Sequence, residues 1–234
     1  VKIDGSNLGS ALAGSIAATR LSANTTSGFS IVTYEGTEAV ATVAHGLSQA
    51  PELILFKNTD SALFWPVYNK TIDATDYLIL NDSNARIDSD GYFNDTEPTS
   101  TVFSLGDKTN LNRDTCIAYC FHSVEGYSKV GSYEGNGNAD GTFIYTGFKP
   151  AYTLIKRIDT ANDWMIGDNK TSPYNVTDNM LRANLSDAQQ SGNNVDYVSN
   201  GFKIRISGNA FNNSSGTYVY VAFAESPFKY SNAR

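Results

Sequence analysis

The sequence predicts an all-β protein made of two similar β-sandwich-like units. The chain is rich in Gly, Asn, Ser and Thr, and only 18% of its 234 residues are charged. This composition is typical of short strands joined by many polar turns. Short strand-like runs follow one another along the whole chain. Two stretches of about a hundred residues each repeat the same series of runs, which indicates an internal repeat.

The first copy begins and ends with alternating segments, residues 29–36 and residues 115–123. Alternation of apolar and polar residues indicates a strand with one buried face. Residues 52–58 form a short apolar run that is typical of a buried strand. Two further strand-like segments follow it, at residues 64–69 and 76–82.

The second copy contains the same series. Residues 152–158 are a short apolar run, residues 163–169 follow turn residues, and residues 179–185 fit either a strand or a short turn of helix. Residues 201–207 alternate cleanly. Residues 216–225 carry apolar or aromatic side chains on both faces, so we expect a central strand between two layers.

The repeat is supported by matched blocks that occur in the same order. Tyr34-Glu35-Gly36 matches Tyr133-Glu134-Gly135, and the only two tryptophans, Trp65 and Trp164, match at a similar offset. Further matches pair Pro51 with Pro150, Leu55 with Leu154, Lys57 with Lys156, residues 88–93 with 198–203, and Phe121 with Phe223. We therefore predict repeat units at residues 28–125 and 126–234, either as two sandwich-like units or as one sandwich with pseudo-twofold symmetry.

The two ends of the chain lie outside this simple scheme. Residues 1–27 contain small residues and few charges, so we expect a linker or shoulder segment that packs on a neighbouring domain or subunit, or a flexible tail. Residues 228–231 resemble the start of a further repeat. Either these residues form a last strand that closes the sheet, or the true boundary between repeats lies a few residues after the one given above. The chain begins with Val, which we interpret as a processed or internal end of a longer protein.

Charge, hydrophobicity and cysteine content limit the partners and the cellular compartments that fit this chain. A net charge of −7 argues against nucleic-acid binding, and the chain has no apolar run long enough to span a membrane. Cys116 and Cys120 lie on one face of a predicted strand, too far apart for a disulfide. We expect buried free thiols there, which fits synthesis in a reducing compartment. A metal site with His122 has the wrong spacing, so we predict neither a metal nor a cofactor.

No pattern in the chain predicts catalysis. The two histidines, His45 and His122, belong to no known catalytic motif, and the nucleophile-elbow, zinc-protease and P-loop patterns are missing. Glu35 and Glu134 occupy equivalent places in the two copies, which favours a structural role over a catalytic pair. We therefore predict that the protein is not an enzyme.

Four aromatic residues are the candidate binding residues. Trp65 and Trp164 could stack on sugar rings, although their position between apolar runs favours core packing. Tyr174 and Tyr197 lie in two loops, residues 171–180 and 186–200, that differ between the copies. Loops that vary on a shared scaffold are the usual place for a binding site. Asn69, Asn94, Asn169 and Asn175 begin Asn-x-Ser/Thr motifs, which chance and turn chemistry largely explain.

Several long blocks resemble a domain of unknown function that recurs in tail-fibre and other structural proteins of tailed bacteriophages, many of them marine. The similar blocks cover nearly the whole chain: residues 13–36, 42–58, 97–106, 117–137, 140–157, 172–178 and 222–234. The resemblance implies a virion location and a role in structure or host attachment. It identifies no catalytic residues.

The function that we expect is that of a bacteriophage virion structural protein, in a tail fibre or spike that attaches to a host-surface glycan. We expect a homo-oligomer, in particular a trimer, that contacts other virion proteins and is synthesised in the bacterial cytoplasm. Three alternatives stay open: a capsid decoration or scaffold protein, a secreted lectin-like adhesin of a cell, and a polysaccharide depolymerase.

Overall fold

The computed structural model describes residues 1–7 and 12–227, and the chain divides into two compact units. Unit 1 comprises Val1–Leu80 and Arg86–His122, and unit 2 comprises Asn81–Ala85 and the chain from Ser123 onward. Strands hold 42% of the residues and helix only 2%, which confirms the all-β prediction. Among the described residues, no helix is both long and apolar enough to cross a membrane.

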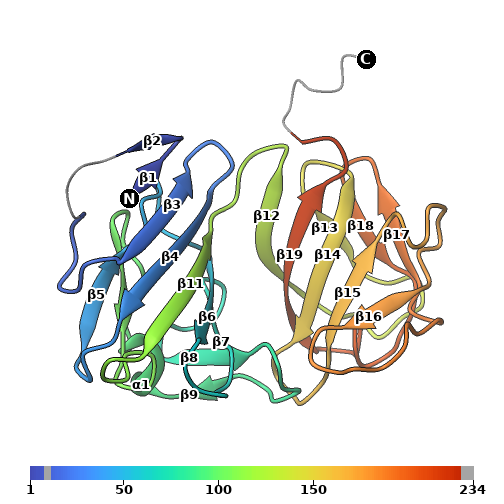
Figure 1. Ribbon diagram of the computed structural model, residues 1–234. Coiled ribbons are helices and arrows are strands. Elements are labelled where there is room, and N and C mark those ends of the chain that lie inside the picture. The colour runs from blue at the N-terminus through green and yellow to red at the C-terminus, as the bar shows by residue number, and fades with distance from the viewer. Residues whose placement is uncertain (8–11, 228–234) are drawn as a thin grey trace. The chain divides into compact units, whose positions relative to one another are not determined.

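Unit 1 contains a nine-stranded sheet in the order β2-β1-β3-β4-β11-β6-β7-β8-β9 and a separate pair of strands, β10-β5 (Figure 1). All neighbouring strands are antiparallel except β1 and β3. The strands are β1 (Lys2–Ile3), β2 (Ser6–Asn7), β3 (Arg20–Asn24), β4 (Phe29–Glu35), β5 (Ala41–Ala44), β6 (Leu53–Asn58), β7 (Pro66–Asn69), β8 (Asp76–Ile79), β9 (Ile87–Asp88), β10 (Val102–Leu105) and β11 (Thr115–Phe121).

The core of unit 1 joins one face of the large sheet to β5, β10 and the short helix α1 (Asp90–Phe93). Alternate residues of β4 and β11 face it, because successive side chains of a strand point to opposite sides. Cys116 and Cys120 are among them. Both are free and buried, as predicted. Burial raises the pKa of the Cys120 thiol to about 12, which keeps it protonated and unreactive.

The N-terminal segment takes part in this sheet. Residues 1–27 were expected to be a linker or shoulder segment, and they supply β1, β2 and β3. Five residues of β3 pair with β4 in register, and Leu21 and Ala23 are buried in the core. An unpaired β4 would expose a row of backbone hydrogen-bonding groups, and β3 satisfies them.

Unit 2 contains a five-stranded sheet in the order β12-β19-β14-β15-β16 and a three-stranded sheet in the order β13-β18-β17 (Figure 1). All of these pairs are antiparallel, and the core lies between the two sheets. The strands are β12 (Ser128–Glu134), β13 (Phe143–Tyr145), β14 (Pro150–Arg157), β15 (Trp164–Asp168), β16 (Met180–Arg182), β17 (Val195–Val198), β18 (Gly201–Ile204) and β19 (Thr217–Ala224).

Strand β19 has the central position predicted for residues 216–225. It pairs with β12 on one side and β14 on the other. All five residues from Tyr218 to Ala222 are buried. The ambiguous segment at residues 179–185 forms the short strand β16 and is not helical. Residues 228–231, the possible start of a further repeat, lie outside the described residues.

The same strand order occurs in both units. In unit 1 it is β4-β11-β6-β7-β8, and in unit 2 it is β12-β19-β14-β15-β16. The remaining pairs also correspond, β5 with β10 and β13 with β18. The descent of both units from one duplicated segment stays a prediction.

One block of the sequence repeat falls in different elements. Residues 88–93, which were matched with residues 198–203, form the end of β9 and helix α1, whereas the second block spans the end of β17, a turn and the start of β18. The strand that corresponds to β18 in unit 1 is β10, further along the chain. The glycine that the two blocks share lies in α1 in unit 1 and begins β18 in unit 2, and glycine is common in this chain, so the match carried little information about which elements correspond.

A buried asparagine closes the turn after β4 in unit 1. The Oδ1 atom of Asn110 accepts a hydrogen bond from the backbone N–H of Thr37 at 3.0 Å, and its Nδ2 atom donates to Thr37 Oγ1 and to the Ala39 carbonyl. Asn110 is fully buried. The turn lies so close to the Asn110 segment that a Cβ atom on Gly36 would collide with the Leu111 carbonyl oxygen.

The same arrangement occurs in unit 2 after β12. The Oδ1 atom of Asn212 accepts from the Asn136 N–H at 2.9 Å, and its Nδ2 atom donates to Asn136 Oδ1 and to the Asn138 carbonyl. A Cβ atom on Gly135 would collide with the Asn213 carbonyl oxygen. These contacts explain the repeated Tyr-Glu-Gly motif, whose glycine has no room for a side chain. We call Asn110 and Asn212 the turn asparagines.

The tyrosine of each Tyr-Glu-Gly motif binds the segment that carries the turn asparagine. Tyr34 donates to the Thr109 carbonyl at 2.6 Å, and Tyr133 donates to the Phe211 carbonyl at 2.8 Å. Burial raises the pKa of both phenols well above the ordinary value. Both groups therefore stay protonated and act as hydrogen-bond donors.

A buried lysine holds the segment 81–85 in unit 2. Lys156 is fully buried, and its Nζ atom donates to the carbonyls of Ser83 and Asn162, at 3.1 and 2.7 Å. The Asn162 N–H also donates to the Ser83 carbonyl, at 2.8 Å. Burial lowers the pKa of Lys156 to about 8, because the charged form loses its hydration.

We expect that replacing either turn asparagine destabilises its own unit. Asn110→Ala and Asn212→Ala leave several buried backbone groups without partners, which should lower the free energy of unfolding by about 2–4 kcal/mol. Urea unfolding followed by hydrogen exchange of β4 and β12 would measure the loss in each unit. The exposed neighbour Asn112, replaced by Ala, is the matched control. A loss no larger than that of the control would contradict the role of the turn asparagines.

The buried His45 should make unit 1 less stable in acid. Its Nδ1 atom accepts from the Leu47 N–H, its Nε2 atom lies 3.1 Å from the Thr99 carbonyl, and burial lowers its pKa to about 4. The unfolded chain binds this proton near the ordinary pKa of about 6.5. The stabilisation is therefore complete above pH 6.5 and should fall by about 3 kcal/mol as the pH drops to 4.

Equilibrium unfolding of unit 1 between pH 7 and pH 4 would check this expectation. His45→Gln keeps a neutral amide at the position and should reduce the dependence on pH. An equally steep loss of stability in wild type and variant would show that other groups cause it.

Candidate functional site

The two units differ most clearly in the connection between corresponding strands β7–β8 and β15–β16. In unit 1 it consists of residues 70–75, and in unit 2 it is the longer segment 169–179. In unit 2 this segment and its neighbours form a polar pocket of about 200 Å³. The pocket is lined by Lys149, Asn169, Ser172, Pro173, Tyr174, Asn175, Thr177 and Tyr197.

The start of the segment is fixed by Asp168, the last residue of β15. Its Oδ1 atom accepts from the backbone N–H groups of Lys170 and Thr171, both at 2.8 Å, and its Oδ2 atom accepts from the Thr171 hydroxyl. Burial alone would raise the pKa of Asp168, but these hydrogen bonds lower it below the ordinary value. The carboxylate therefore stays ionised and holds the turn.

Asn175 ties the middle of the segment to β17. Its Nδ2 atom donates to the Tyr197 carbonyl and its Oδ1 atom accepts from the Tyr197 N–H, both at 3.0 Å. Thr177 and Val195 exchange two backbone hydrogen bonds next to this contact. The segment is therefore anchored at several points, and the pocket that it borders is preformed.

The structure brings the two candidate tyrosines to the same pocket, in different roles. Tyr197 is buried, and its hydroxyl lies 2.6 Å from Thr153 Oγ1, so it forms part of the wall. Burial raises its pKa well above the ordinary value. Tyr174 is 85% exposed, more than any other large hydrophobic residue in the described part of the chain. Its ring is free to stack on a ligand.

Asn169 lines the pocket and carries an acceptor that no described residue of the protein satisfies. Its Nδ2 atom donates to Glu225 Oε1 at 2.8 Å, and Lys149 forms an ion pair with Glu225 Oε2, also at 2.8 Å. The Asn169 Oδ1 atom is buried and has no hydrogen-bond partner within the described part of the chain. An unsatisfied buried acceptor is unfavourable, so a hydroxyl or amide donor of a ligand would gain free energy by reaching it.

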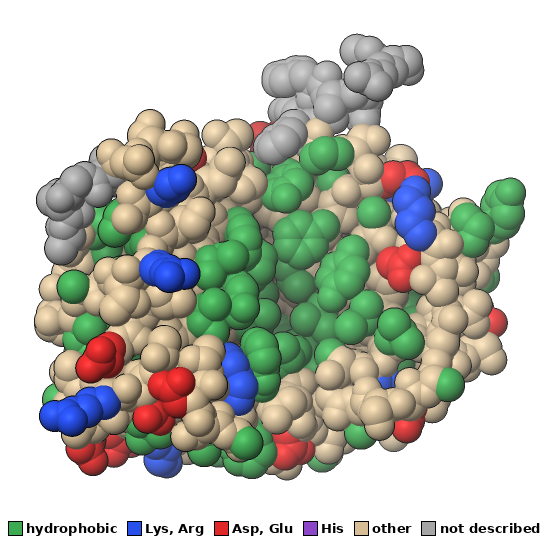
Figure 2. Space-filling view, viewed as in Figure 1, with side chains coloured by type: hydrophobic (Ala, Val, Ile, Leu, Met, Phe, Trp, Pro, Cys, Tyr) green, Lys and Arg blue, Asp and Glu red, His purple; other side chains and the backbone are tan. Residues whose placement is uncertain are grey.

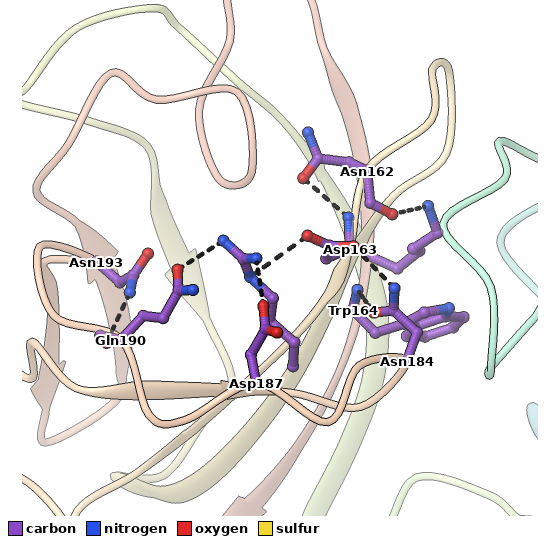
Figure 3. Close-up of polar contacts among 9 residues, drawn as sticks. Asn162, Asp163, Trp164, Asn184, Asp187, Gln190 and Asn193 are labelled. Carbon is purple, nitrogen blue, oxygen red and sulfur yellow. Dashed lines mark hydrogen bonds and ion pairs between the residues drawn. The ribbon is translucent and has the colours of Figure 1, made fainter.

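A polar network fixes residues 183–194, the connection between β16 and β17, which contains the first part of the second variable loop, residues 186–200 (Figure 3). Arg182 donates to Gln190 at 2.6 Å and forms ion pairs with Asp163 and Asp187, both at 3.3 Å. Asn184 donates to Asp163 at 2.8 Å (Figure 3). The network joins β15, β16 and the loop, and it supports the pocket region without lining it.

Neither tryptophan lines this pocket. Trp164 is buried, and its backbone N–H donates to Asn184 Oδ1 at 2.9 Å. Trp65 is half-buried, with Lys57 Nζ 5.8 Å from the centre of its ring. Trp164 is the first residue of β15, and Trp65 directly precedes β7, which has the corresponding place in the strand order of unit 1.

Charge is dispersed on the surface. Cationic and anionic side chains are scattered over the face shown in Figure 2 and form no large patch of one sign there. In the described ranges, no three side chains of His, Cys, Asp or Glu come together in a group that could hold a metal ion.

Sequence reasoning named two residues of the pocket and missed the amides. Asn169 and Asn175 were noticed only as Asn-x-Ser/Thr motifs, and the structure uses their side chains to build the pocket. The signal that could have identified them is the extra length of residues 169–179 relative to the first copy. Lys149 and Glu225 carried no such signal, because they lie far from the loop in sequence.

The chain was also compared with known proteins. Residues 4–227 match the model of a domain of unknown function, DUF7483, and the chain belongs to this family. No curated protein and no solved structure matches the chain.

We expect that Asn175→Ala loosens the pocket segment. The change removes two hydrogen bonds to Tyr197, so the Tyr197 amide should exchange about tenfold faster, equivalent to about 1.4 kcal/mol. Hydrogen exchange measured by NMR would check this. Asn179→Ala is the control. Asn179 binds Ser172 through its backbone N–H, so this substitution removes a carboxamide from the same segment and leaves that contact in place. Equal exchange rates in both variants would rule out an anchoring role for the Asn175 side chain.

Proposed function

Taking the chain as a DUF7483 protein, we propose that it is a bacteriophage virion structural protein, in a tail fibre or spike that attaches to a host-surface glycan. The resemblance of its long sequence blocks to virion proteins of tailed bacteriophages supports this proposal. An all-β fold with few charges and many polar loops is compatible with it.

The single observation that carries the proposal is the polar pocket of unit 2. Tyr174 offers an exposed aromatic ring, and the Asn169 carbonyl oxygen needs a donor. A sugar presents apolar C–H groups on the face of its ring and hydroxyl groups around its edge. The ligand class that fits best is therefore an uncharged, hydroxyl-rich saccharide unit, with its ring on Tyr174 and a hydroxyl donated to Asn169.

The carboxylates beside the pocket favour binding over cleavage. Asp168 holds the turn at residues 170–171, and Glu225 binds both Lys149 and Asn169. The hydrogen bond from Lys149 lowers the pKa of Glu225 below its ordinary value, so this group is a poor proton donor. A glycosidase needs one carboxyl group with a raised pKa to protonate the leaving oxygen.

The proposal includes the assembly in which the pocket would act. We propose a homo-oligomer, in particular a trimer, joined to other virion proteins. Several copies would multiply a weak single-site affinity for a repetitive polysaccharide. The protein would be synthesised in the bacterial cytoplasm and act on the extracellular particle.

Binding of the labelled protein to an array of bacterial surface polysaccharides would test the attachment function. We expect binding to a subset of neutral glycans, and at least a tenfold loss of affinity in Tyr174→Ala, because removal of an aromatic anchor commonly costs about 2 kcal/mol. Tyr145→Ala is the matched control, since Tyr145 is an exposed tyrosine of the same unit, 66% exposed, outside the pocket.

Three results would contradict the proposal in different ways. Binding to no glycan would favour a decoration or scaffold role. Equal losses in Tyr174→Ala and Tyr145→Ala would place the binding site elsewhere. Release of shortened saccharides from the array would indicate a depolymerase.

A further inference from the structure

Unit 1 contains a second pocket of a different chemical character. Its volume is about 230 Å³. Most of its walls are apolar or aromatic: Phe56, Leu63, Phe64, Pro66, Tyr92 and Leu111. A dry cavity of about 150 Å³ holds a molecule of the size of benzene, so this pocket has room for one ring or a short alkyl chain.

Two lysines border the same pocket. Lys57 and Lys108 both line it, and neither forms an ion pair with a carboxylate of the described residues. Lys108 Nζ lies 5.4 Å from the centre of the Tyr92 ring and 3.5 Å from Ser89 Oγ. Two positive charges at the margin of an apolar pocket are complementary to an amphipathic anion.

The apolar wall is held in place before any ligand binds. Lys57 Nζ donates to the Ser61 carbonyl at 3.3 Å and to the Leu63 carbonyl at 2.9 Å. This fixes the segment that carries Leu63 and Phe64, whose side chains stay 43% and 49% exposed. An ammonium group has three donors, so Lys57 keeps one donor and its full charge for a ligand.

The corresponding place in unit 2 shows that the fold does not require these apolar side chains. The contact between lysine and loop carbonyl is repeated there, because Lys156 donates to the Asn162 carbonyl. The residues that correspond to Leu63 and Phe64 are Asn162 and Asp163, counted from the matching tryptophans. A loop with this contact therefore also forms with polar side chains, so the contact does not explain the apolar pair in unit 1.

We propose that this pocket binds a small amphipathic carboxylate, with its alkyl or aryl part against Phe56, Leu63 and Leu111 and its carboxylate at Lys108 and Lys57. The site is separate from the saccharide pocket of unit 2 and does not depend on it. Octanoate is the probe that matches the volume and the charge.

Isothermal titration of the full chain with octanoate tests the proposal, with 1-octanol and octylammonium as neutral and cationic counterparts. We expect a Kd of roughly 0.1–1 mM for octanoate, with octanol weaker and octylammonium weakest. Lys108→Gln should weaken octanoate about fivefold and leave octanol unchanged, as expected for one exposed charge. The exposed Lys129 of unit 2, replaced by Gln, is the matched control.

A second variant distinguishes binding inside the pocket from non-specific binding to the protein surface. Leu111→Trp should fill the pocket and abolish binding of both octanoate and octanol, and NMR spectra of the free variant would show that unit 1 is folded. Three results would overturn the proposal: no binding of octanoate at 10 mM, octanol binding as tightly as octanoate, or equal effects of Lys108→Gln and Lys129→Gln.

Discussion

Each unit depends on how a buried asparagine closes the turn that leaves its sheet. After β4 and after β12 the chain turns sharply into the second layer, and its backbone groups lose the partners that a strand would provide. One asparagine side chain per unit, Asn110 or Asn212, supplies both a donor and acceptor to this turn. A carboxamide suits this task because it carries both functions in one plane.

This constraint explains why the units look alike where they do. The glycine of the Tyr-Glu-Gly motif lets the turn approach the asparagine segment, and the tyrosine hydroxyl binds the same segment from the core. Two non-glycine residues, Arg113 and Ser215, take a left-handed backbone at the corresponding position of that segment. Such a conformation is unfavourable by itself, and the surrounding hydrogen bonds compensate for it.

The units differ where this shared frame leaves loops free. Unit 2 lengthens the connection before β16 and fills it with amides and a tyrosine, so its pocket is polar. Unit 1 places Leu63 and Phe64 on a loop held by Lys57, so its pocket is apolar. The same contact with the loop is made by the half-buried Lys57 in unit 1 and by the fully buried Lys156 in unit 2. Because this backbone contact is common to both units, the side chains next to it can differ in polarity without changing it.

The sequence by itself determined the strand-rich fold, the central position of β19 and the burial of both cysteines. Alternation and apolar runs are local properties, and they record which face of a strand is buried. It also identified the pocket tyrosines, because variable loops stand out against a repeated background. Only the tertiary structure decided that β1, β2 and β3 complete the sheet of unit 1. It alone showed that Asn110 and Asn212 close turns more than seventy residues away in sequence. It also placed Asn169 and Lys149 at one pocket, with Glu225 bound to both. These contacts depend on hydrogen bonds between distant segments, and no local pattern of residues encodes such a partner.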